Sequence, residues 1–430
     1  MKTLFSGSTG PQVQLLQLAL ARAGFAPLAI DGQFGARTLR ALKSFQQKQG
    51  LAADGIAGPA THRALHPWYT GYVNRTLRPG DSFYRLAKRF GSSVPAIAAA
   101  NPGLDPRSLP VGAVVRVPLG FDVVPTRLDW CSELVNYCCE GLTARYPAVR
   151  DSEIGKSAMG RPLHCLRLGR GRARVAYNAA HHANEWITTP LLMKFTEQLA
   201  AADAFDGEIF GRGARALLDA AELAVVPCVN PDGMDLVTGD LTDGADYRAA
   251  RSIAADYPGV AFPRGWKANI RGVDLNLQYP AGWERAREIK FTQGYISPAP
   301  RDYVGSAPLV APEARAMYAF TQSYSPALTI SYHTQGSVIY WKYLDLDPPG
   351  ALALGRRFAA VSSYLLEDTP YASGFAGYKD WFIQDFDRPG YTVEAGLGDN
   401  PLPITEFDRI YGENLGILTL ALACAPKLPA

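Results

Sequence analysis

The stretch Tyr177-Asn-Ala-Ala-His181-His182-Ala-Asn-Glu185-Trp186 follows a short apolar run at residues 174–178. Two more apolar runs, at 223–230 and 327–332, are separated from it by helix-like stretches. Short apolar runs that alternate with helices are typical of the buried strands of an α/β domain. The segment 120–430 is therefore predicted to be an α/β domain with a mixed or largely parallel central sheet.

His182 and Glu185 lie three residues apart, on the loop or first helical turn after the first run. Side chains at this spacing can converge on one point. Zinc accepts neutral imidazole nitrogen and carboxylate oxygen, and a hydrolytic zinc site uses three protein ligands and leaves one position for water. His333, directly after the run at 327–332, is the only well-placed third ligand among the six histidines.

An HxxE pattern also arises by chance, so two other interpretations stand beside the zinc site. In the first, His182 packs against Trp186 and Glu185 is a solvated carboxylate at a helix start. In the second, His181 replaces His182, because its spacing of four residues from Glu185 also suits a helix face. Spacing alone leaves these alternatives open.

The order of motifs in the C-terminal segment narrows the choice. The HxxE pair is followed by Asn-Pro-Asp-Gly at 230–233, Gly-Val-Asp-Leu-Asn at 272–276, Ser-Tyr-His at 331–333 and Tyr-Thr-Val-Glu at 391–394. This series resembles the zinc carboxypeptidase family. The resemblance implies one zinc ion per chain, held by His182, Glu185 and His333. It also implies that Glu394 is the general base, which takes a proton from water and passes it to the leaving amine.

Two departures from the family pattern bear on function. The family carries an oxyanion-stabilising arginine after a tryptophan, whereas Trp266 is followed here by Lys267, with Arg271 nearby as a second candidate cation. The exopeptidases also carry an arginine that clamps the terminal carboxylate of the substrate, where this chain has Leu277 after Asn276. Leucine cannot make that two-pronged bond, so ordinary trimming of C-terminal residues is in doubt.

The segment 371–381 resembles the part of the family that carries a mobile tyrosine and a residue that selects the substrate side chain. Tyr371 and Tyr378 both fit the tyrosine, and the register places Lys379 at the selecting position. With Asn276, these are the predicted substrate contacts. A lysine at that position is expected to favour a carboxylate-bearing group beyond the cleaved bond; the alternative is a lysine that is merely exposed.

Residues 1–67 contain one short pattern twice, Asp31-Gly-Gln-Phe-Gly35 before Thr38 and Asp54-Gly-Ile-Ala-Gly58 before Thr61. Each copy predicts a tight turn that leads into a short helix, which the threonine helps to cap. Helical apolar spacing before and between the copies completes a small all-α bundle. The segment resembles the peptidoglycan-binding helical domain found beside bacterial wall hydrolases.

Residues 69–119 predict a strand, two helices and a final strand. Asp81 or Ser82 fits the N-cap of the first helix, Gly91 its end, and Asn101 before proline the end of the second helix. This βααβ order resembles the LysM module, which binds N-acetylglucosamine polymers, and the resemblance places the sugar site at 80–82 and near 101–109. The chain is thus predicted to be multidomain, with domains at 1–67, 69–119 and 120–430.

Basic and acidic residues are distributed unequally along the 430 residues. Residues 1–120 hold 14 lysines and arginines against 4 acidic residues, and the other 310 hold 29 against 36. A basic N-terminal part favours an anionic partner such as cell wall, nucleic acid or lipid headgroups. The two wall-binding-like modules favour the wall, and no nucleic-acid reader motif accompanies the basic residues.

Six cysteines without zinc-finger spacing or a CxxC pair predict reduced, mostly buried thiols. No apolar stretch is long enough for a transmembrane helix, and the N-terminus turns polar before a signal-peptide segment can develop. We therefore expect cytoplasmic synthesis without a signal peptide and action on the cell wall or its fragments, as in sporulation, lysis or recycling.

Together the resemblances imply the γ-D-glutamyl-L-diamino acid endopeptidase branch of the zinc carboxypeptidases, which often carries such N-terminal modules. We expect a zinc-dependent peptidoglycan hydrolase that cuts the γ-D-glutamyl–meso-diaminopimelate bond of wall stem peptides. The far end of that diamino acid carries an amine and a carboxylate, which can stand in for a C-terminus. The alternatives are a zinc carboxypeptidase that trims wall or other peptides and an inactive wall-binding scaffold.

Overall fold

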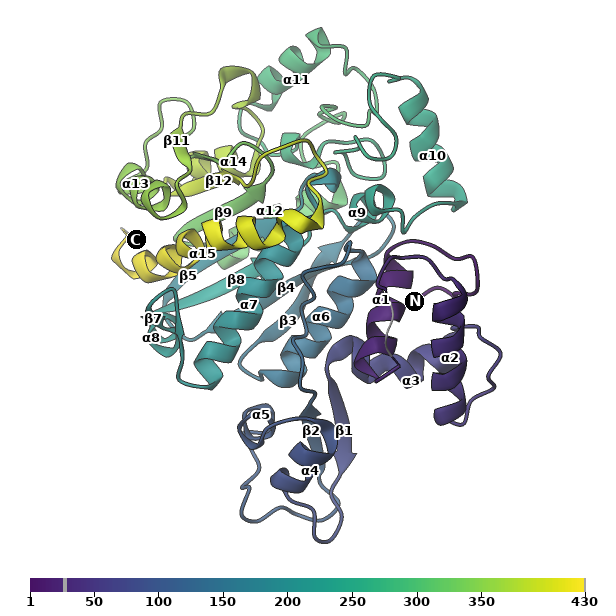
Figure 1. Ribbon diagram of the computed structural model, residues 1–430. Coiled ribbons are helices and arrows are strands. Elements are labelled where there is room, and N and C mark those ends of the chain that lie inside the picture. The colour runs from purple at the N-terminus through teal and green to yellow at the C-terminus, as the bar shows by residue number, and fades with distance from the viewer. Residues whose placement is uncertain (26–28, 429–430) are drawn as a thin grey trace. The chain divides into compact units, whose positions relative to one another are not determined.

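The computed structural model describes residues 1–25 and 29–428, and the chain divides into two compact units, Met1–Arg150 and Asp151–Ala430. Figure 1 shows both units and labels their helices and strands where there is room. The last two residues of the predicted catalytic domain, 429–430, lie outside the described residues.

The first part of the N-terminal unit consists of helices, as its apolar spacing predicts. These are α1 (Pro11–Arg22), α2 (Ala36–Lys48) and α3 (Pro59–Thr70). The predicted threonine caps are wrong, because Gly35 and Gly58 occupy the N-cap positions of α2 and α3 and neither helix has a side-chain cap.

Two buried glutamines hold the repeated turns in place through hydrogen bonds. Gln17 donates through Nε2 to Asp31 Oδ1 at 2.9 Å and to Thr38 Oγ1 at 3.1 Å, and its Oε1 accepts from Gly32 N at 3.0 Å. Gln46 makes the same bonds in the second copy, at 2.8, 3.2 and 3.0 Å, to Asp54, Thr61 and Gly55. Each turn is therefore held by a buried amide from the preceding helix, and the threonine serves that amide rather than the helix end.

The second part of the N-terminal unit has the predicted βααβ order. Its elements are β1 (Tyr72–Thr76), α4 (Phe83–Phe90), α5 (Val94–Ala100) and β2 (Val114–Pro118), and β1 pairs antiparallel with β2. Ser82 is the N-cap of α4, since its Oγ accepts from Arg85 N at 3.2 Å, and Gly91 ends that helix with φ of 62°. The unit also contains α6 (Ser132–Arg145), which the sequence assigns to the third domain.

A mixed eight-stranded sheet forms the centre of the second unit and confirms the predicted α/β class. In spatial order its strands are β11 (Leu365–Glu367), β10 (Val338–Tyr340), β12 (Gly390–Glu394), β9 (Leu328–His333), β5 (Ala173–Ala179), β8 (Ala221–Val226), β4 (Pro162–Gly169) and β3 (Arg150–Lys156). The central strands β12, β9, β5 and β8 run parallel, and antiparallel pairs flank them at β10–β12 and β4–β8. A separate hairpin joins β6 (Glu208–Ile209) to β7 (Arg212–Gly213).

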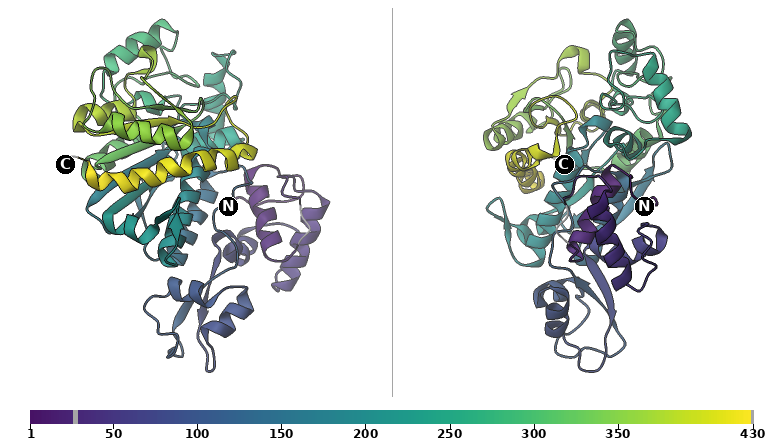
Figure 2. Two further views of the ribbon diagram at one scale, coloured as in Figure 1. Left: turned by 60° about the vertical axis from the view of Figure 1, so that its left-hand side comes forward. Right: turned by 45° about the vertical axis from the view of Figure 1, so that its right-hand side comes forward.

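Successive side chains of a strand point to opposite faces of the sheet, and here each face packs against a layer of helices. Tyr177 of β5 packs on Phe195 and donates to the carbonyl of Leu418, so its face is covered by α7 (Thr188–Ala204) and α15 (Phe407–Cys424) (Figure 2). Ala176 belongs to the core on the opposite face, together with Trp381. The remaining helices are α8 (Ala214–Ala220), α9 (Pro231–Thr238), α10 (Gly244–Ala255), α11 (Trp283–Thr292), α12 (Pro312–Tyr324), α13 (Ala351–Ser362) and α14 (Tyr378–Phe386).

The carboxyl ends of three parallel strands meet at one edge of this sheet. His333, the last residue of β9, lies opposite Glu394, the last residue of β12. On the other side of β9, Ala179 of β5 lies opposite Tyr332. Segments that leave neighbouring parallel strands are brought together at such an edge. The stretch after β5, which holds the HxxE pair, therefore meets His333 and Glu394.

All six cysteines are buried thiols, as predicted. Burial raises the pKa of Cys165 and of Cys228 to about 12, so both stay as thiols at neutral pH. Within the described parts of the chain, no helix combines the length and the apolar character that crossing a bilayer requires.

Replacing Gln46 with alanine is expected to lower the local free energy of unfolding by about 1–3 kcal/mol, because buried partners of the turn lose their hydrogen bonds. Gln47, its exposed neighbour on α2, provides the matched control. Gln47→Ala should stay within about 0.5 kcal/mol of wild type. Hydrogen exchange of residues 36–65 in the full chain, measured by mass spectrometry, compares the two variants. Equal protection would show that the buried amide does not hold the turn.

Candidate metal centre and active-site pocket

The side chains predicted as zinc ligands converge at the sheet edge. Glu185 ends the 3-10 turn Ala183–Glu185, and each of its carboxylate oxygens faces one imidazole. Oε1 lies 3.0 Å from Nδ1 of His182, and Oε2 lies 2.9 Å from Nδ1 of His333. The two Nδ1 atoms are 3.2 Å apart. Glu185 and His333 are each 1% exposed, so this cluster lies in the interior.

The spacing of these three donor atoms fits one zinc ion. Ligands bound about 2.0–2.2 Å from a tetrahedral ion lie about 3.4 Å from one another. Each oxygen of Glu185 lies 2.9–3.0 Å from one imidazole nitrogen, and the two nitrogens are 3.2 Å apart. One ligand atom from each of the three residues lies within 4.8 Å of the other two, so a small movement of the side chains would admit the ion. Two imidazole nitrogens and one carboxylate oxygen are also the donor set of hydrolytic zinc sites.

Further hydrogen bonds orient the candidate ligands. Asp274 places Oδ1 3.0 Å from Nε2 of His182, which fixes the imidazole ring and directs its Nδ1 to the cluster. Asp274 is itself held in place, because its other oxygen accepts from Asp302 N at 3.1 Å. Glu185 Oε2 accepts a further bond from Thr334 N at 3.2 Å.

The charges of the cluster balance one another. Burial acts to raise the pKa of Glu185, but the nearby charges of Lys267 and His182 outweigh it and hold that pKa well below its usual range. Burial acts to lower the pKa of His182, but Glu185 and Asp274 outweigh it and raise the pKa to about 9. Zinc binds the neutral imidazole, so a metal ion at this site would compete with a proton for His182.

His181 lies outside the cluster. Its Nε2 is 3.0 Å from the hydroxyl of Tyr279, and its ring stacks on that of His333 with centroids 5.8 Å apart. It is fully buried, and its ring packs on that of the candidate ligand His333. Of the two neighbouring histidines, only His182 has a ring nitrogen within hydrogen-bond distance of Glu185.

Lys267 and Glu394 lie beside the cluster, next to Glu185 and His333 respectively. Nζ of Lys267 lies 3.0 Å from Oε1 of Glu185. Burial, together with the charge of Glu185, raises the pKa of Glu394 against the opposing effects of His333 and Lys267. A carboxyl whose pKa is raised is suited to exchange protons. Arg271, the other cation predicted from the sequence, is not brought here: it pairs with Asp246 at 2.8 Å and does not line the pocket.

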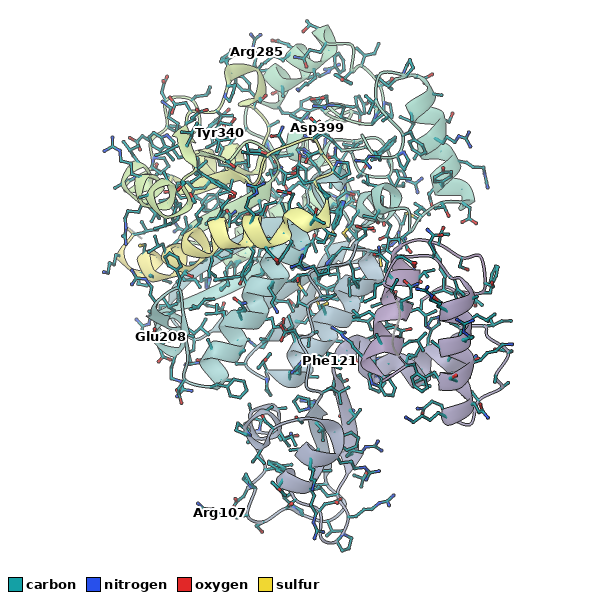
Figure 3. The ribbon with its side chains drawn as sticks, viewed as in Figure 1. Arg107, Phe121, Glu208, Arg285, Tyr340 and Asp399 are labelled. Carbon is teal, nitrogen blue, oxygen red and sulfur yellow. The ribbon has the colours of Figure 1, made fainter. Side chains whose placement is uncertain are left out.

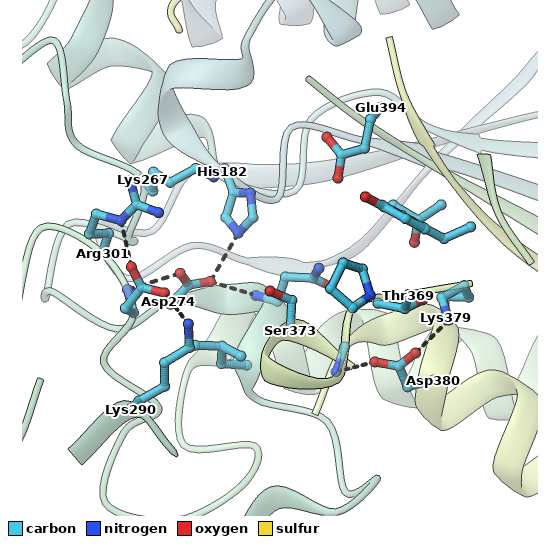
Figure 4. Close-up of a pocket in the computed structure, with 17 residues that line it drawn as sticks. His182, Lys267, Asp274, Lys290, Arg301, Thr369, Ser373, Lys379, Asp380 and Glu394 are labelled. Atoms are coloured by element: carbon cyan, nitrogen blue, oxygen red, sulfur yellow. Dashed lines mark hydrogen bonds and ion pairs between the residues drawn. The ribbon is translucent and has the colours of Figure 1, made fainter. Parts of the chain in front are cut away.

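A pocket of about 250 Å³ opens beside the cluster and is lined by charges of both signs (Figure 4). Its cations are Lys267, Lys290, Arg301 and Lys379, and its carboxylates are Asp274, Asp302, Asp380 and Glu394. Sequence reasoning missed five of these eight, namely Asp274, Lys290, Arg301, Asp302 and Asp380. Asp274 lies within the Gly-Val-Asp-Leu-Asn motif and could have been found there, whereas no motif marks Lys290, Arg301 or Asp302.

Asn276, Leu277 and Lys379 line this pocket. Lys379 is 4% exposed, so the alternative of a merely exposed lysine is wrong. Its ammonium lies 2.6 Å from Oδ1 of Asp380 and donates to the carbonyl of Lys342 at 2.6 Å. The pocket therefore presents a buried pair of opposite charges where the sequence predicts a single cation.

The structure brings neither candidate tyrosine to the pocket. Tyr371 is 59% exposed, and its hydroxyl accepts from Nε of Arg285 at 3.2 Å. Tyr378 is fully buried, and its hydroxyl lies 2.8 Å from Oγ1 of Thr321. The segment that precedes Tyr378 still borders the pocket through Ser373.

Comparisons with known proteins match three parts of the chain. A zinc carboxypeptidase family model matches residues 135–414, a peptidoglycan binding domain model residues 9–65 and a LysM domain model residues 76–118. Gamma-D-glutamyl-L-diamino acid endopeptidase 1 of Lysinibacillus sphaericus is 44% identical over 281 residues, which are 65% of this chain and 69% of that protein. Zinc D-Ala-D-Ala carboxypeptidase of Streptomyces albus G is 52% identical over 68 residues, 15% of this chain and 26% of that protein.

Solved structures share the fold at lower identity. Carboxypeptidase A from Helicoverpa armigera superposes with a TM-score of 0.52 at 19% sequence identity, over 80% of each chain. The family model covers well over half of the chain, and the superposition on carboxypeptidase A shows that the two proteins share a fold. This protein belongs to the zinc carboxypeptidase family and carries two N-terminal modules of wall-binding type.

Proposed function

We propose that the protein is a zinc-dependent peptidoglycan hydrolase that cleaves the γ-D-glutamyl–meso-diaminopimelate bond of wall stem peptides. One observation carries the proposal: the pocket has Leu277 where a carboxylate-clamping arginine is expected, and it holds Lys379 and Asp380 as a buried pair of opposite charges. The far end of diaminopimelate bears an ammonium and a carboxylate, which suit such a pair. The name of the 44% identical relative supports the same activity.

In this mechanism His182, Glu185 and His333 would hold the zinc ion, which when bound lowers the pKa of water and polarises the scissile carbonyl. Glu394 accepts the proton of the attacking water and returns it to the leaving amine. Lys267 offers its ammonium to the negative charge that develops on the carbonyl oxygen. Asp274 keeps His182 oriented throughout through the bond to Nε2.

The N-terminal modules would hold the enzyme on its polymeric substrate. Residues 1–120 carry an excess of ten positive charges, which suits an anionic wall. For the LysM module we propose an N-acetylglucosamine site at residues 80–82 and 101–109. Tyr84, two residues beyond the first of these stretches, is 69% exposed. The site of action would be the cell wall or fragments released from it.

Mass spectrometry of purified muropeptides after digestion tests the function directly. The expected products are a fragment that ends in D-glutamate and one that begins with diaminopimelate still joined to its downstream residue. A chelator should abolish both, and added zinc should restore them. Release of single C-terminal residues would favour the carboxypeptidase alternative, and no cleavage with zinc bound would favour the scaffold.

Glu394→Gln removes the proposed base while keeping the shape of the side chain. It is expected to lower kcat about a hundredfold to ten-thousandfold with zinc content unchanged. Glu288, which is exposed on α11 and pairs with Arg285, gives the control variant Glu288→Gln. Steady-state kinetics on a defined stem peptide, with zinc analysis of each preparation, compares the three proteins. Near-normal turnover of Glu394→Gln would rule out the mechanism.

Lys379→Met tests the substrate side of the pocket. The preference for a diaminopimelate peptide over its lysine counterpart is expected to fall about tenfold or more, because the extra carboxylate loses its cation. Each ratio compares two substrates on the same enzyme preparation, so the fraction of unfolded enzyme does not change the ratio. Lys342→Met is the control, because Lys342 bonds to Lys379 through its backbone carbonyl while its side chain pairs with Asp368. An unchanged ratio in Lys379→Met would refute this role.

A further inference from the structure

Two hollows that share lining residues lie beside the metal centre. The first is the pocket of Figure 4, here called the amine-side pocket. The second, of about 540 Å³, is lined by Asn184, residues 259–261, Gly265, Thr334, Gln335, Asp399 and Asn400, and is here called the acyl-side hollow. Figure 3 labels Tyr340, which lines both, and Asp399, which lines only the second. An enzyme that cuts within a chain needs space on both sides of the scissile bond, and these hollows supply it.

The charges assign the hollows to the two halves of the substrate. Lys379 and Asp380 line only the amine-side pocket, and their opposite charges match the zwitterionic end of the diamino acid. The acyl-side hollow then receives the γ-D-glutamyl residue and the chain that precedes it. This assignment rests on the proposed function.

The γ-D-glutamyl residue brings a carboxylate close to the scissile bond. Because the bond is made through the γ-carbonyl, the α-carboxylate stays free. It is separated from the γ-carbonyl carbon by four carbon–carbon bonds, at most about 5 Å. A cation at the border between the two hollows is therefore placed to bind it.

Arg301 is such a cation. Besides Tyr340, the residues that line both hollows are Lys267, Arg301 and Glu394. Figure 4 shows Arg301 and Lys267 on the same side of the pocket, across from Glu394. Lys267 is already paired with Glu185 and its side chain is 18% exposed. The side chain of Arg301 is 43% exposed, so it is open to a ligand.

The hydrogen bonds of Arg301 leave donors for that ligand. Its Nε donates to Oδ2 of Asp302, which fixes the plane of the guanidinium. Lys290 pairs with the other oxygen of Asp302, so that carboxylate is shared between two cations. Among the residues that the structure describes, the two terminal nitrogens of Arg301 have no hydrogen-bond partner, and they form the fork that binds a carboxylate with two bonds.

We propose that Arg301 binds the α-carboxylate of the γ-D-glutamyl residue and makes the enzyme selective for the free acid over the α-amide. The test uses two L-alanyl-γ-D-glutamyl-diaminopimelate peptides, one with the free α-carboxylate and one with the α-amide (D-isoglutamine). Wild type is expected to cleave the acid with a kcat/KM about tenfold to hundredfold higher. Arg301→Ala should remove this preference by slowing the acid alone, mainly through KM, and Arg301→Lys should restore part of it.

Arg409 supplies the matched control. It also pairs with carboxylates, its side chain is 39% exposed, and it lies on α15, away from both hollows. Arg409→Ala should keep the preference of wild type. If Arg301→Ala keeps it too, or slows both peptides equally, the assignment of Arg301 is wrong while the proposed function stands. If wild type cleaves neither peptide at the γ-D-glutamyl bond, the proposed function itself fails, and the assignment fails with it.

Discussion

The buried carboxylate of Glu185 is the interaction on which the candidate site depends. One oxygen faces His182 and Lys267, and the other faces His333 and the backbone of Thr334. A carboxylate that is 1% exposed would be costly without such partners. Because four groups from three segments of the chain converge on this one side chain, it fixes the positions of both candidate imidazole ligands and of the cation beside them.

The sheet explains how these segments reach one point. His333 and Glu394 end adjacent parallel strands and lie in register, and the HxxE stretch leaves the next strand at the same edge. Parallel strands order their carboxyl ends at one edge whatever the length of the connections between them. The chemistry at that edge can therefore vary through the loops while the candidate ligands stay in place.

Charge of both signs distinguishes the pocket beside the metal centre. A site for an ordinary C-terminus needs one cation, whereas this pocket holds Lys379 against Asp380 and Lys290 and Arg301 against Asp302. Paired charges keep their side chains fixed before a ligand arrives, which lowers the entropy lost on binding. A substrate rich in ammonium and carboxylate groups, such as a wall stem peptide, is the kind of ligand that this arrangement suits.

The sequence by itself determined the class of each module and the residues that converge on the metal centre. It did so because apolar periodicity reports which elements are buried, and because the order of HxxE, His333 and Glu394 along the chain resembles the zinc carboxypeptidase series; spacing alone left His181 open. Only the tertiary structure decided that His181 turns to Tyr279, that Arg271 pairs with Asp246 outside the pocket, and that Arg301 and Asp302 enter it. These outcomes depend on contacts between residues far apart in the chain, and a side chain's direction there is set by packing and by the available opposite charges rather than by its neighbours in sequence.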